Sequence, residues 1–361
     1  MVYPKSFAKL FKVIKNYEIS ASPHAIFRTL KGLVRARILK KNTLRAIELY
    51  PTFACQANCP MCSVAPYKEK ARGRKQLSLE DYDSLARKAG RLGATTIIIL
   101  GGEPTLYNDI VPLVSIFKKH HYFIHMVSNG LQLEEKLLRS LKEAGLASMF
   151  FSLESLDAAE NDKLRGRGHH RKTMENISAC QQISLEVGLA PIFFPGKVNQ
   201  ALEIIDYCHE KGLRASGGQI SKIGKAIDMP VLSEEEIEQV RKSLDQYPNF
   251  VFDWSFSYFP GIACPAGREK IGITLNGDVI PCSYNPISFG NVFEEGLSLI
   301  LKRMGAFSQF KKKYEGCMCS EDKFYIETYQ SCIANSTSYP VMYSEHPRIN
   351  HTEEPELYSV K

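Results

Sequence analysis

Long apolar runs are missing from this 361-residue sequence, because none approaches the ~20 residues that a helix needs to span a bilayer. The first residues, MVYPKSFAKLFKVIKNY, also lack an apolar core followed by small residues, so we expect no secretory signal peptide. No internal repeat or low-complexity segment is present. These absences favour a cytoplasmic globular protein, in which thiols stay reduced and clustered cysteines bind metal more often than they form disulfides.

Acidic residues are scarce at the start of the chain. Residues 1–45 hold eleven Lys and Arg but one acidic residue, Glu18, which gives this segment a charge of about +10. The whole chain carries a charge of +7, so the other 316 residues carry about −3. The basic character therefore belongs to the leading segment and not to the body of the protein.

Two amphipathic helices are predicted in this basic arm, residues 1–43. The first has apolar residues at i, i+3, i+4 and i+7 over residues 7–14, and the second begins at Ser22-Pro23, a helix-start signal. The apolar stripe of the second helix is formed by Ile26, Phe27, Leu30, Val34 and Ile38. Two interpretations stay open: the stripes pack on the body of the protein, or they attach to an anionic surface such as the inner face of the membrane, or to a phosphate-bearing partner. No nucleic acid partner is expected, because the arm lacks interleaved aromatic residues and groove-reading motifs.

Short apolar runs alternate with amphipathic stretches from about residue 44 to residue 250, which is the pattern of repeated β-α units. The runs ATTIIIL, FIHMVSNG and ASMFFSLE, for example, begin at residues 94, 123 and 147. About six units are predicted, fewer than the eight of a closed barrel. We therefore expect an α/β fold, a partial (β/α)6 TIM-like barrel, with its chemistry at the carboxyl ends of the strands.

The pattern changes after residue 250. Residues 268–284, REKIGITLNGDVIPCSY, predict a β-hairpin that turns at Asn276-Gly277. Residues 297–316 predict a helix, and a cysteine-rich segment follows it. These features indicate a small α+β iron–sulfur domain over residues 251–335. The polar tail, residues 336–361, shows no periodicity and is expected to be extended or mobile.

The ten cysteines form two groups, with two isolated residues between them. CQANCPMC places Cys55, Cys59 and Cys62 within eight residues. Three thiolates on a [4Fe–4S] cube would leave one iron open to a chelating small molecule, and a zinc site completed by a distant histidine or cysteine is the alternative. Cys180 and Cys208 lie on predicted helices, where we expect them to be buried as small hydrophobic residues.

The C-x3-C-x2-C spacing, followed about 40 residues later by GGEP, resembles the radical S-adenosylmethionine (SAM) enzymes. The resemblance implies that SAM chelates the open iron and is cleaved reductively to a 5′-deoxyadenosyl radical, which abstracts hydrogen from a substrate. It also implies that Gly101 and Gly102 let the backbone approach the amino group of SAM, and that Glu103 contributes a carboxylate there.

VSNG, residues 127–130, follows the next apolar run and resembles another SAM-facing segment of this family. The resemblance implies that Ser128 and Asn129 contact SAM. The alternative for Asn129-Gly130 is a turn-forming role.

FSLESLDAAENDKLRGRG, which begins at residue 151, resembles a stretch found in relatives with additional clusters. The resemblance implies that Ser152 and Glu154 lie near the ribose of SAM and that Arg165 lies near its carboxylate. The family usually has aspartate where this chain has Glu154, and the alternative for Arg165 is a solvated cation at a helix end. The neighbouring His169 and His170 are predicted to belong to an exposed basic patch and not to bind metal.

The C-terminal cysteines extend the resemblance. Cys264, Gly277 and Cys282 form a C-x12-G-x4-C hairpin, which resembles the opening of the auxiliary-cluster domains called SPASM, or twitch in their shorter version. A complete SPASM domain carries two further [4Fe–4S] clusters and needs seven or eight cysteines, so we expect one auxiliary [4Fe–4S] cluster and a spare thiol. The candidate ligands are Cys264, Cys282, Cys317, Cys319 and Cys332. Whether the closely spaced Cys317 and Cys319 both bind the cluster stays open.

The resemblance implies an oxidoreductase whose auxiliary cluster accepts an electron from a substrate radical, as dehydrogenation or oxidative cross-linking requires. The arm is too short and too helical for the usual peptide-recognition domain, which weakens the case for a peptide substrate. Because the arm is basic and amphipathic, we expect a small alcohol, sugar or lipid-linked substrate. The alternatives are redox-neutral epimerisation or C–C bond formation, modification of a peptide, and an iron–sulfur electron-transfer or metal-binding protein without SAM chemistry. The other expected partners are an electron donor, such as flavodoxin or ferredoxin, and the membrane surface.

Overall fold

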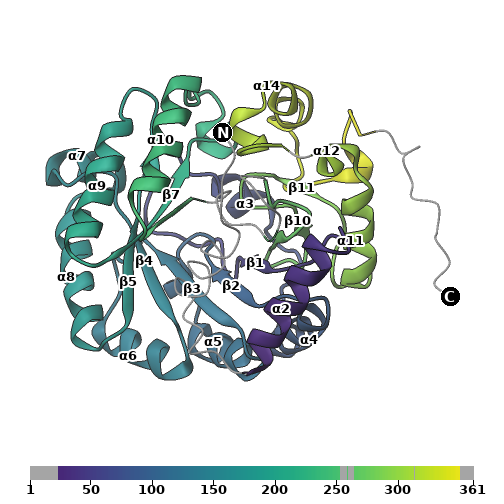
Figure 1. Ribbon diagram of the computed structural model, residues 1–361, viewed down its shortest axis with the longest axis horizontal. Coiled ribbons are helices and arrows are strands. Elements are labelled where there is room, and N and C mark those ends of the chain that lie inside the picture. The colour runs from purple at the N-terminus through teal and green to yellow at the C-terminus, as the bar shows by residue number, and fades with distance from the viewer. Residues whose placement is uncertain (1–22, 253–257, 259–263, 313, 350–361) are drawn as a thin grey trace.

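The computed structural model of this chain describes residues 23–252, 258, 264–312 and 314–349 (Figure 1). The first predicted helix of the arm and residues 350–361 of the tail lie outside the described residues. Within the described ranges, no helix combines the length and the apolar character that crossing a membrane requires.

A curled sheet of ten strands forms the centre of the molecule, like a barrel that is left open on one side (Figure 1). The strands lie in the order β10-β9-β1-β2-β3-β4-β5-β7-β6, and β8 also pairs with β7. These pairings are parallel except for that of β9 with β10. The strands are β1 Ala46–Leu49, β2 Thr96–Ile99, β3 Phe123–Ser128, β4 Ser148–Ser152, β5 Glu186–Ala190, β6 Ile192–Phe193, β7 Arg214–Gln219, β8 Phe250–Phe252, β9 Lys270–Ile273 and β10 Val279–Ile280.

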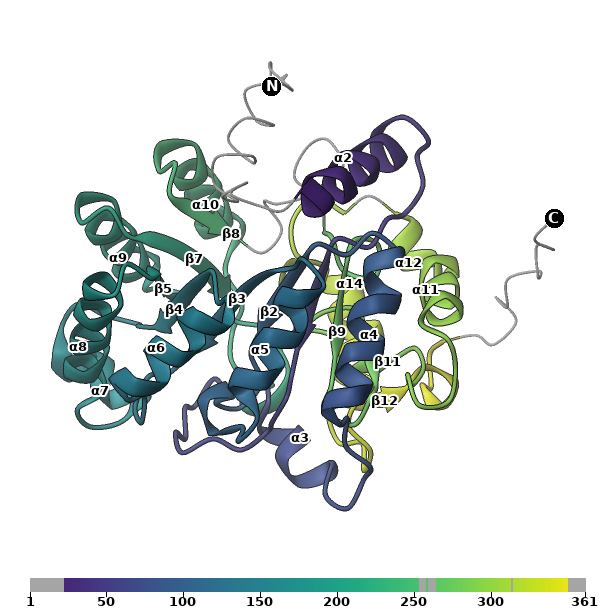
Figure 2. The same ribbon diagram turned by 90° about the horizontal axis from the view of Figure 1, so that it is seen from below.

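Helices cover the outer face of this sheet, so the predicted α/β fold with a partial barrel is confirmed (Figures 1 and 2). Alternate strand residues face the helices, and in β3 Ile124 and Met126 are fully buried. Cys180 and Cys208 are buried as predicted, and burial raises the pKa of both thiols to about 12. The helices are α3 Ala65–Lys70, α4 Leu79–Arg91, α5 Ile110–Lys119, α6 Glu135–Ala144, α7 Ala158–Arg165, α8 His169–Gln182, α9 Val198–Glu210 and α10 Glu234–Gln246.

Capping boxes fix the starts of α4 and α10. Ser78 Oγ accepts a hydrogen bond from the Asp81 backbone N–H, and the Asp81 carboxylate accepts one from the Ser78 N–H. Ser233 and Glu236 repeat this arrangement in α10. Each box satisfies two backbone donors that a helix start would otherwise leave unpaired.

The C-terminal part of the chain joins the barrel through its hairpin. β9 pairs with β1, and the predicted turn at Asn276-Gly277 is confirmed, with Gly277 at a φ of 83° that glycine adopts readily. The predicted helix over residues 297–316 is interrupted, because Phe307 leaves the helical conformation and packs against Phe289 and Phe310. The elements of this part are α11 Leu297–Ala306, α12 Ser308–Lys311, α13 Met318–Glu321, α14 Lys323–Tyr325, β11 Ile287–Ser288 and β12 Val341–Met342.

Residues 336–349 of the predicted tail pack on the body, so the expectation of an extended or mobile segment is wrong for them. β12 pairs in parallel with β11, and Val341 lies opposite Ile287. The ring of Tyr339 packs edge-on against that of Tyr67, with 4.5 Å between the ring centroids. The apolar anchors of this segment are irregularly spaced, and a periodic pattern does not reveal them.

Helix α2, Pro23–Arg37, confirms the second predicted helix of the arm and lies at the opposite end of the barrel from α3 (Figure 2). Its predicted stripe does not pack on the body, so that interpretation is wrong for this helix. Phe27 and Leu30 are exposed, whereas Ala25, Gly32 and Ala36 are buried. The helix therefore docks through its small residues and Leu33, and turns most of its large apolar residues outward.

Candidate active site

The loop that leaves the carboxyl end of β1 carries Cys55, Cys59 and Cys62. Cys59 is buried, and Cys55 and Cys62 are half-buried. Burial raises the pKa of the Cys55 thiol, and the nearby Glu103, Cys59 and Cys62 add to this effect. Apolar side chains, including that of Ile220, pack around Cys59. Three neighbouring thiols in a partly dry loop fit the donor set that an iron–sulfur cluster requires.

The GGEP segment lies directly against the backbone of this loop. The Gly102 N–H donates to the carbonyl of Thr52 at 2.9 Å, and the Glu103 N–H donates to that of Ala54 at 2.7 Å. Gly101 has a φ of 130°, and a Cβ there would lie 2.5 Å from the Thr52 oxygen. The two glycines therefore allow close contact with the cysteine loop, and their contact with SAM stays a prediction.

The carboxylate of Glu103 is a hub that joins GGEP to the end of β3. It accepts hydrogen bonds from Ser128 Oγ at 2.7 Å and from the Asn129 N–H at 2.7 Å. The backbone N–H and hydroxyl of Thr105 also donate to it. Glu103 is 1% exposed, so these donors satisfy a buried charge. Thr105 belongs to no motif that the sequence reveals. Its position two residues after Glu103, which caps a turn, is the only feature of the sequence that suggests this contact.

The side chain of Asn129 connects this hub to the cysteine loop. Its Nδ2 donates towards Cys55 Sγ at 3.6 Å, and Gln56 Nε2 donates to its Oδ1 at 3.1 Å. The Leu131 N–H donates to the same Oδ1 at 2.9 Å. Asn129 therefore forms a local turn and also contacts the cysteine loop, and its contact with SAM stays a prediction.

Arg165 and Glu154 form a buried ion pair beside Cys59. Arg165 Nε donates to Glu154 Oε1 at 2.9 Å, and Arg165 Nη1 donates towards Cys59 Sγ at 3.6 Å. The Ile192 N–H donates to the second oxygen of Glu154 at 2.8 Å. Burial alone would lower the pKa of Arg165, but Glu154 and Cys59 together raise it. Arg165 is thus a buried cation and not a solvated one at a helix end.

The segment after β4 is held by two residues that the sequence did not mark as part of the site. Asn161 Oδ1 accepts a hydrogen bond from the Glu154 N–H at 3.0 Å, and Asn161 Nδ2 lies 3.1 Å from His169 Nδ1. His169 is fully buried, and burial lowers its pKa to about 4, so its prediction as part of an exposed patch is wrong. Ser152, at the end of β4, is also buried.

Four of the C-terminal cysteines come together where the hairpin meets α13. Cys282, Cys317 and Cys319 are buried and Cys264 is half-buried, and burial raises the pKa of Cys264 to about 11. A hydrogen bond with Cys282 is the first factor that raises the pKa of Cys319, and burial, Cys317 and Cys264 add to it. Among the described residues, no three His, Cys, Asp or Glu side chains meet as ligands of one metal ion. A cluster does not require such a meeting point, because each thiol binds its own iron.

Cys332, the fifth C-terminal candidate, lies apart from these four. It is exposed, and its thiol donates to the backbone carbonyls of Thr328 at 3.2 Å and Tyr329 at 3.6 Å. Its sulfur lies 3.7 Å from His346 Nε2. The structure therefore brings Cys317 and Cys319 into the auxiliary group and leaves Cys332 outside it.

Glu321 links the auxiliary cysteines to the barrel. Its Oε1 accepts hydrogen bonds from the Cys317 N–H at 3.0 Å and from Gln219 Nε2, at the end of β7, at 2.9 Å. Burial raises the pKa of Glu321. Ser221 Oγ donates to the carbonyl of Cys319 at 2.9 Å. Ser221 thus holds the backbone of the cysteine segment directly, and Gln219 holds it through Glu321; no sequence motif indicates either contact.

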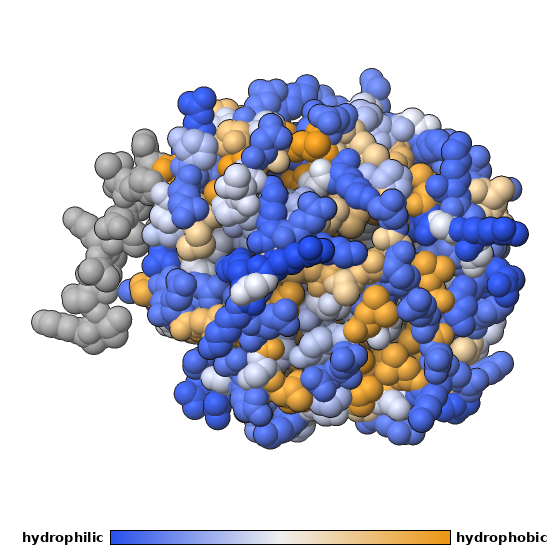
Figure 3. All heavy atoms as spheres, turned by 180° about the vertical axis from the view of Figure 1, so that it is seen from behind, coloured by the Kyte–Doolittle hydropathy of each residue, from blue (hydrophilic) through white to orange (hydrophobic). Residues whose placement is uncertain are grey.

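The end of the molecule that carries α3 is the face seen in Figure 3, where hydrophobic residues gather between hydrophilic ones.

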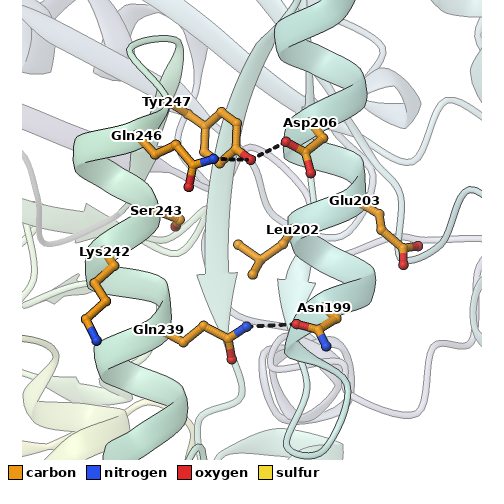
Figure 4. A pocket seen from close by; sticks show the side chains of 9 residues that line it. All are labelled: Asn199, Leu202, Glu203, Asp206, Gln239, Lys242, Ser243, Gln246 and Tyr247. Carbon is orange, nitrogen blue, oxygen red and sulfur yellow. Dashed lines mark hydrogen bonds between the residues drawn. The ribbon is translucent and has the colours of Figure 1, made fainter.

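A separate surface pocket of about 400 Å³ lies between α9 and α10 (Figure 4). Hydrogen bonds cross it from Gln239 to Asn199, at 2.7 Å, and from Tyr247 to Asp206. Because these helices lie on the outer side of the sheet, this pocket is a packing groove away from the cysteine loop.

Two family models match the chain. The model of the radical SAM superfamily matches residues 49–208, and that of the SPASM iron–sulfur cluster-binding domain matches residues 264–322. The first range contains Cys55, Cys59 and Cys62, and the second ends before Cys332. The radical SAM domain implies a [4Fe–4S] cluster and SAM, and the SPASM domain implies auxiliary iron–sulfur chemistry.

Two cyclases are among the proteins with similar sequences. The PqqA peptide cyclase of Rhizobium meliloti is 24% identical over 280 residues, which span 72% of this chain and 74% of that protein. The probable GTP 3′,8-cyclase of Methanococcus maripaludis is 29% identical over 175 residues, which span 47% of this chain and 57% of that protein.

Solved structures share the fold. Streptococcus suis SuiB superposes with a TM-score of 0.60 at 21% identity, covering 78% of this chain and 71% of that chain. Native anSMEcpe with bound AdoMet superposes with a TM-score of 0.54 at 13% identity, covering 74% of this chain and 82% of that chain. The matched domains and the cysteine loop agree: this chain carries a radical SAM domain over residues 49–208 and a SPASM domain over residues 264–322.

Proposed function

We propose that this radical SAM enzyme modifies a peptide, abstracting hydrogen from it and oxidising it, for example by forming a cross-link. The observation that carries this proposal is the similarity to a peptide cyclase over 72% of the chain. The sequence led us to expect a small alcohol, sugar or lipid-linked substrate, and the comparisons favour the peptide alternative over it.

Cys55, Cys59 and Cys62 would bind three irons of the first cluster and leave the fourth for SAM. When bound, the cluster and SAM supply a 5′-deoxyadenosyl radical that abstracts hydrogen from the substrate. The chain's own part is to hold these thiolates. Asn129 donates towards Cys55 and Arg165 donates towards Cys59, and such donors orient the sulfur ligands.

SAM would lie against the polar side chains and glycines at the ends of β2, β3 and β4. The carboxylates of Glu103 and Glu154 already accept several hydrogen bonds from the protein. We therefore infer that these two residues position the neighbouring segments for SAM as well as adding negative charge. The proposed SAM-binding set is Gly101, Gly102, Glu103, Ser128, Asn129, Ser152, Glu154 and Arg165.

Cys264, Cys282, Cys317 and Cys319 would hold one auxiliary [4Fe–4S] cluster. In an oxidative cross-link the peptide loses two hydrogens. One would leave as a hydrogen atom and the other as a proton and an electron, and a cluster held by the four thiols would be able to accept that electron. A flavodoxin or ferredoxin would supply the electron that cleaves SAM.

Anaerobic reconstitution with iron, sulfide, SAM and dithionite tests this proposal. Synthetic peptides encoded beside the gene are the first probes, with GTP as a nucleotide probe because one relative is a probable GTP cyclase. We expect one 5′-deoxyadenosine per modified peptide and a product about two mass units lighter, since two hydrogens are lost. A Cys55→Ala variant controls for background cleavage.

Each other outcome has a clear meaning. If no 5′-deoxyadenosine forms with any probe, SAM chemistry is excluded under these conditions and an electron-transfer role gains support. Incorporation of one solvent deuterium without loss of mass in light water would indicate epimerisation. Turnover of GTP or an alcohol, with every peptide inert, would contradict the peptide proposal.

A further inference from the structure

Helix α2 docks on the barrel through small residues and long polar side chains. Gly32 faces Tyr258, and a Cβ on this glycine would lie 2.6 Å from the ring. Arg28 donates to the carbonyl oxygens of Ala94 at 3.0 Å and His120 at 2.6 Å. Because these contacts join α2 to the loops before β2 and β3, they determine which side of the helix faces outward.

The outward side carries large apolar side chains. The exposed large hydrophobic residues of the described structure are Phe27, Leu30, Val34, Ile38, Leu39, Leu299 and Phe324. The first five lie on α2 or directly after it, are 47% to 70% exposed, and are called the α2 patch below. Residues three, four and seven apart share one side of a helix, so Phe27, Leu30 and Val34 form a continuous stripe. Contiguous exposed apolar surface of this kind marks an interaction site.

Basic side chains border the α2 patch. Lys31 and Lys40 are exposed, and Arg35 lines a cavity of about 350 Å³ between α2 and α11, together with Arg268 and Lys302. The Nε of Arg35 is buried and has no hydrogen-bond partner within the described structure. The other residues that line this basic pocket include no acid; they are Asn42, Leu44, Leu92, Gly267, Ser298, Leu301 and Gly305. The lining of this pocket therefore carries basic but no acidic side chains, which suits a bound anion.

We propose that the α2 patch and the basic pocket dock this enzyme on an anionic phospholipid membrane. The apolar side chains enter the boundary between headgroups and acyl chains, and the basic pocket binds the phosphate of one headgroup. An apolar stripe bordered by Lys and Arg is the composition of helices that lie in the membrane interface. The charge of about +10 on residues 1–45 complements such a surface.

A second copy of the chain fits this surface less well. In a symmetric dimer the same patch meets itself, so the lysines and arginines around one α2 would face those of the other. Like charges brought together at an interface oppose association. An anionic bilayer instead provides an apolar interior that can bury the stripe and negatively charged headgroups that can bind the surrounding lysines and arginines.

Docking through α2 also leaves the candidate active site accessible. The α2 patch lies at the opposite end of the barrel from α3, which follows the cysteine loop (Figure 2). A docked enzyme would turn that loop towards water, where a soluble substrate and an electron donor can approach. Docking in this orientation does not depend on which substrate the enzyme modifies.

Sedimentation of the reconstituted full-length enzyme with vesicles tests the proposal. We expect binding to phosphatidylcholine vesicles that contain about 30% phosphatidylglycerol and little binding to phosphatidylcholine alone. Binding should weaken as NaCl rises to about 0.5 M, because salt screens the basic border.

Variants separate the two parts of the surface. Phe27→Ser combined with Leu30→Ser should lower the partition coefficient at least about tenfold, and Lys302→Gln should lower it about fivefold. The matched controls are Phe324→Ser and Lys136→Gln, which remove an exposed apolar and an exposed basic side chain elsewhere and should leave binding unchanged. All variants should release 5′-deoxyadenosine like the parent enzyme when vesicles are omitted.

Three results would overturn the proposal. The first is an absence of binding to anionic vesicles, or equal losses in the control variants. The second is a dimer in light scattering that the Phe27→Ser, Leu30→Ser variant converts to a monomer while vesicle binding stays the same. The third is a rise in melting temperature with inorganic phosphate that Lys302→Gln abolishes, without vesicle binding, because the pocket would then serve a free phosphate compound.

Discussion

Arg165 donates hydrogen bonds from both Nε and Nη2 to one carboxylate oxygen of Glu154. The two side chains are 11% and 0% exposed, so the pair is shielded from water. Arg165 also reaches Cys59, which means that one ion pair joins α7, the end of β4 and the cysteine loop. Because Arg165 contacts both Glu154 and the cysteine loop, we expect substitutions in this ion pair to lower both the stability and the activity of the enzyme.

Glu154→Gln should destabilise the enzyme strongly, because it leaves the guanidinium of Arg165 buried without its anion. Removal of one partner from a buried ion pair typically costs about 3–5 kcal/mol. Anaerobic urea unfolding measures this loss. Glu175→Gln breaks the exposed pair with Arg171 on α8 and should cost less than about 1 kcal/mol. Similar small losses in both variants would contradict the assignment of Glu154 to a buried pair.

Gly102→Ala should displace the cysteine loop. A Cβ on Gly102 would lie 2.6 Å from the carbonyl oxygen of Phe53 and closer still to that of Ala54. Because a displacement of about 1 Å in a site can cost about 100-fold in rate, we expect 5′-deoxyadenosine release to fall at least tenfold. Gly296→Ala is the control, since a Cβ there would lie 3.9 Å from Ser298 Oγ. If the Gly102 variant released 5′-deoxyadenosine as fast as the parent, the cysteine loop would accommodate the added methyl group without loss of activity.

The cysteine loop and GGEP were predictable because each set of residues lies within a few positions of sequence. The partners that hold them were not, since their contacts depend on how separate segments meet. Thr105 donates to Glu103 across a turn, and His169 reaches Asn161 from the start of α8. A lone histidine in a basic stretch carries no sequence signal that it will be buried.

The apolar pattern of α2 predicted a helix but not the side that docks. A stripe of large residues usually packs inward, yet here Gly32 fits against Tyr258 and Arg28 caps two backbone carbonyls. Small residues, which let a helix pack closely on its neighbour, are common in any helix. Whether they form the docking side can be seen only when the surface that they face is known. The same limit applies to Cys332, because counting thiols does not tell which of them converge.

Iron analysis distinguishes Cys319 from Cys332 as a ligand of the auxiliary cluster. With two [4Fe–4S] clusters, the reconstituted enzyme should bind about eight irons per chain, and Cys319→Ala should bind about four. Cys332→Ala should keep about eight, because this thiol lies outside the group of four. Cys317→Ala should behave like Cys319→Ala. A loss of iron in the Cys332 variant that matches the loss in the Cys319 variant would contradict the proposed ligand set.

His169 should make the folded state sensitive to acid. Burial, with Arg165 nearby, lowers its pKa from 6.5 to about 4, so the folded protein keeps the ring neutral while the unfolded chain protonates it. The contribution of His169 to the free energy of unfolding is therefore fully present above pH 6.5. It falls as the pH drops from there towards 4, by about 1 kcal/mol between pH 7.5 and 5.5.

Urea unfolding at the two pH values should show a smaller loss in His169→Asn than in the parent, whereas His209→Asn, at an exposed position, should match the parent. His125, whose pKa burial also lowers to about 4, keeps part of the pH dependence in every variant. An unchanged difference between pH 7.5 and 5.5 in the His169 variant would mean that this ring is not held neutral in the folded enzyme.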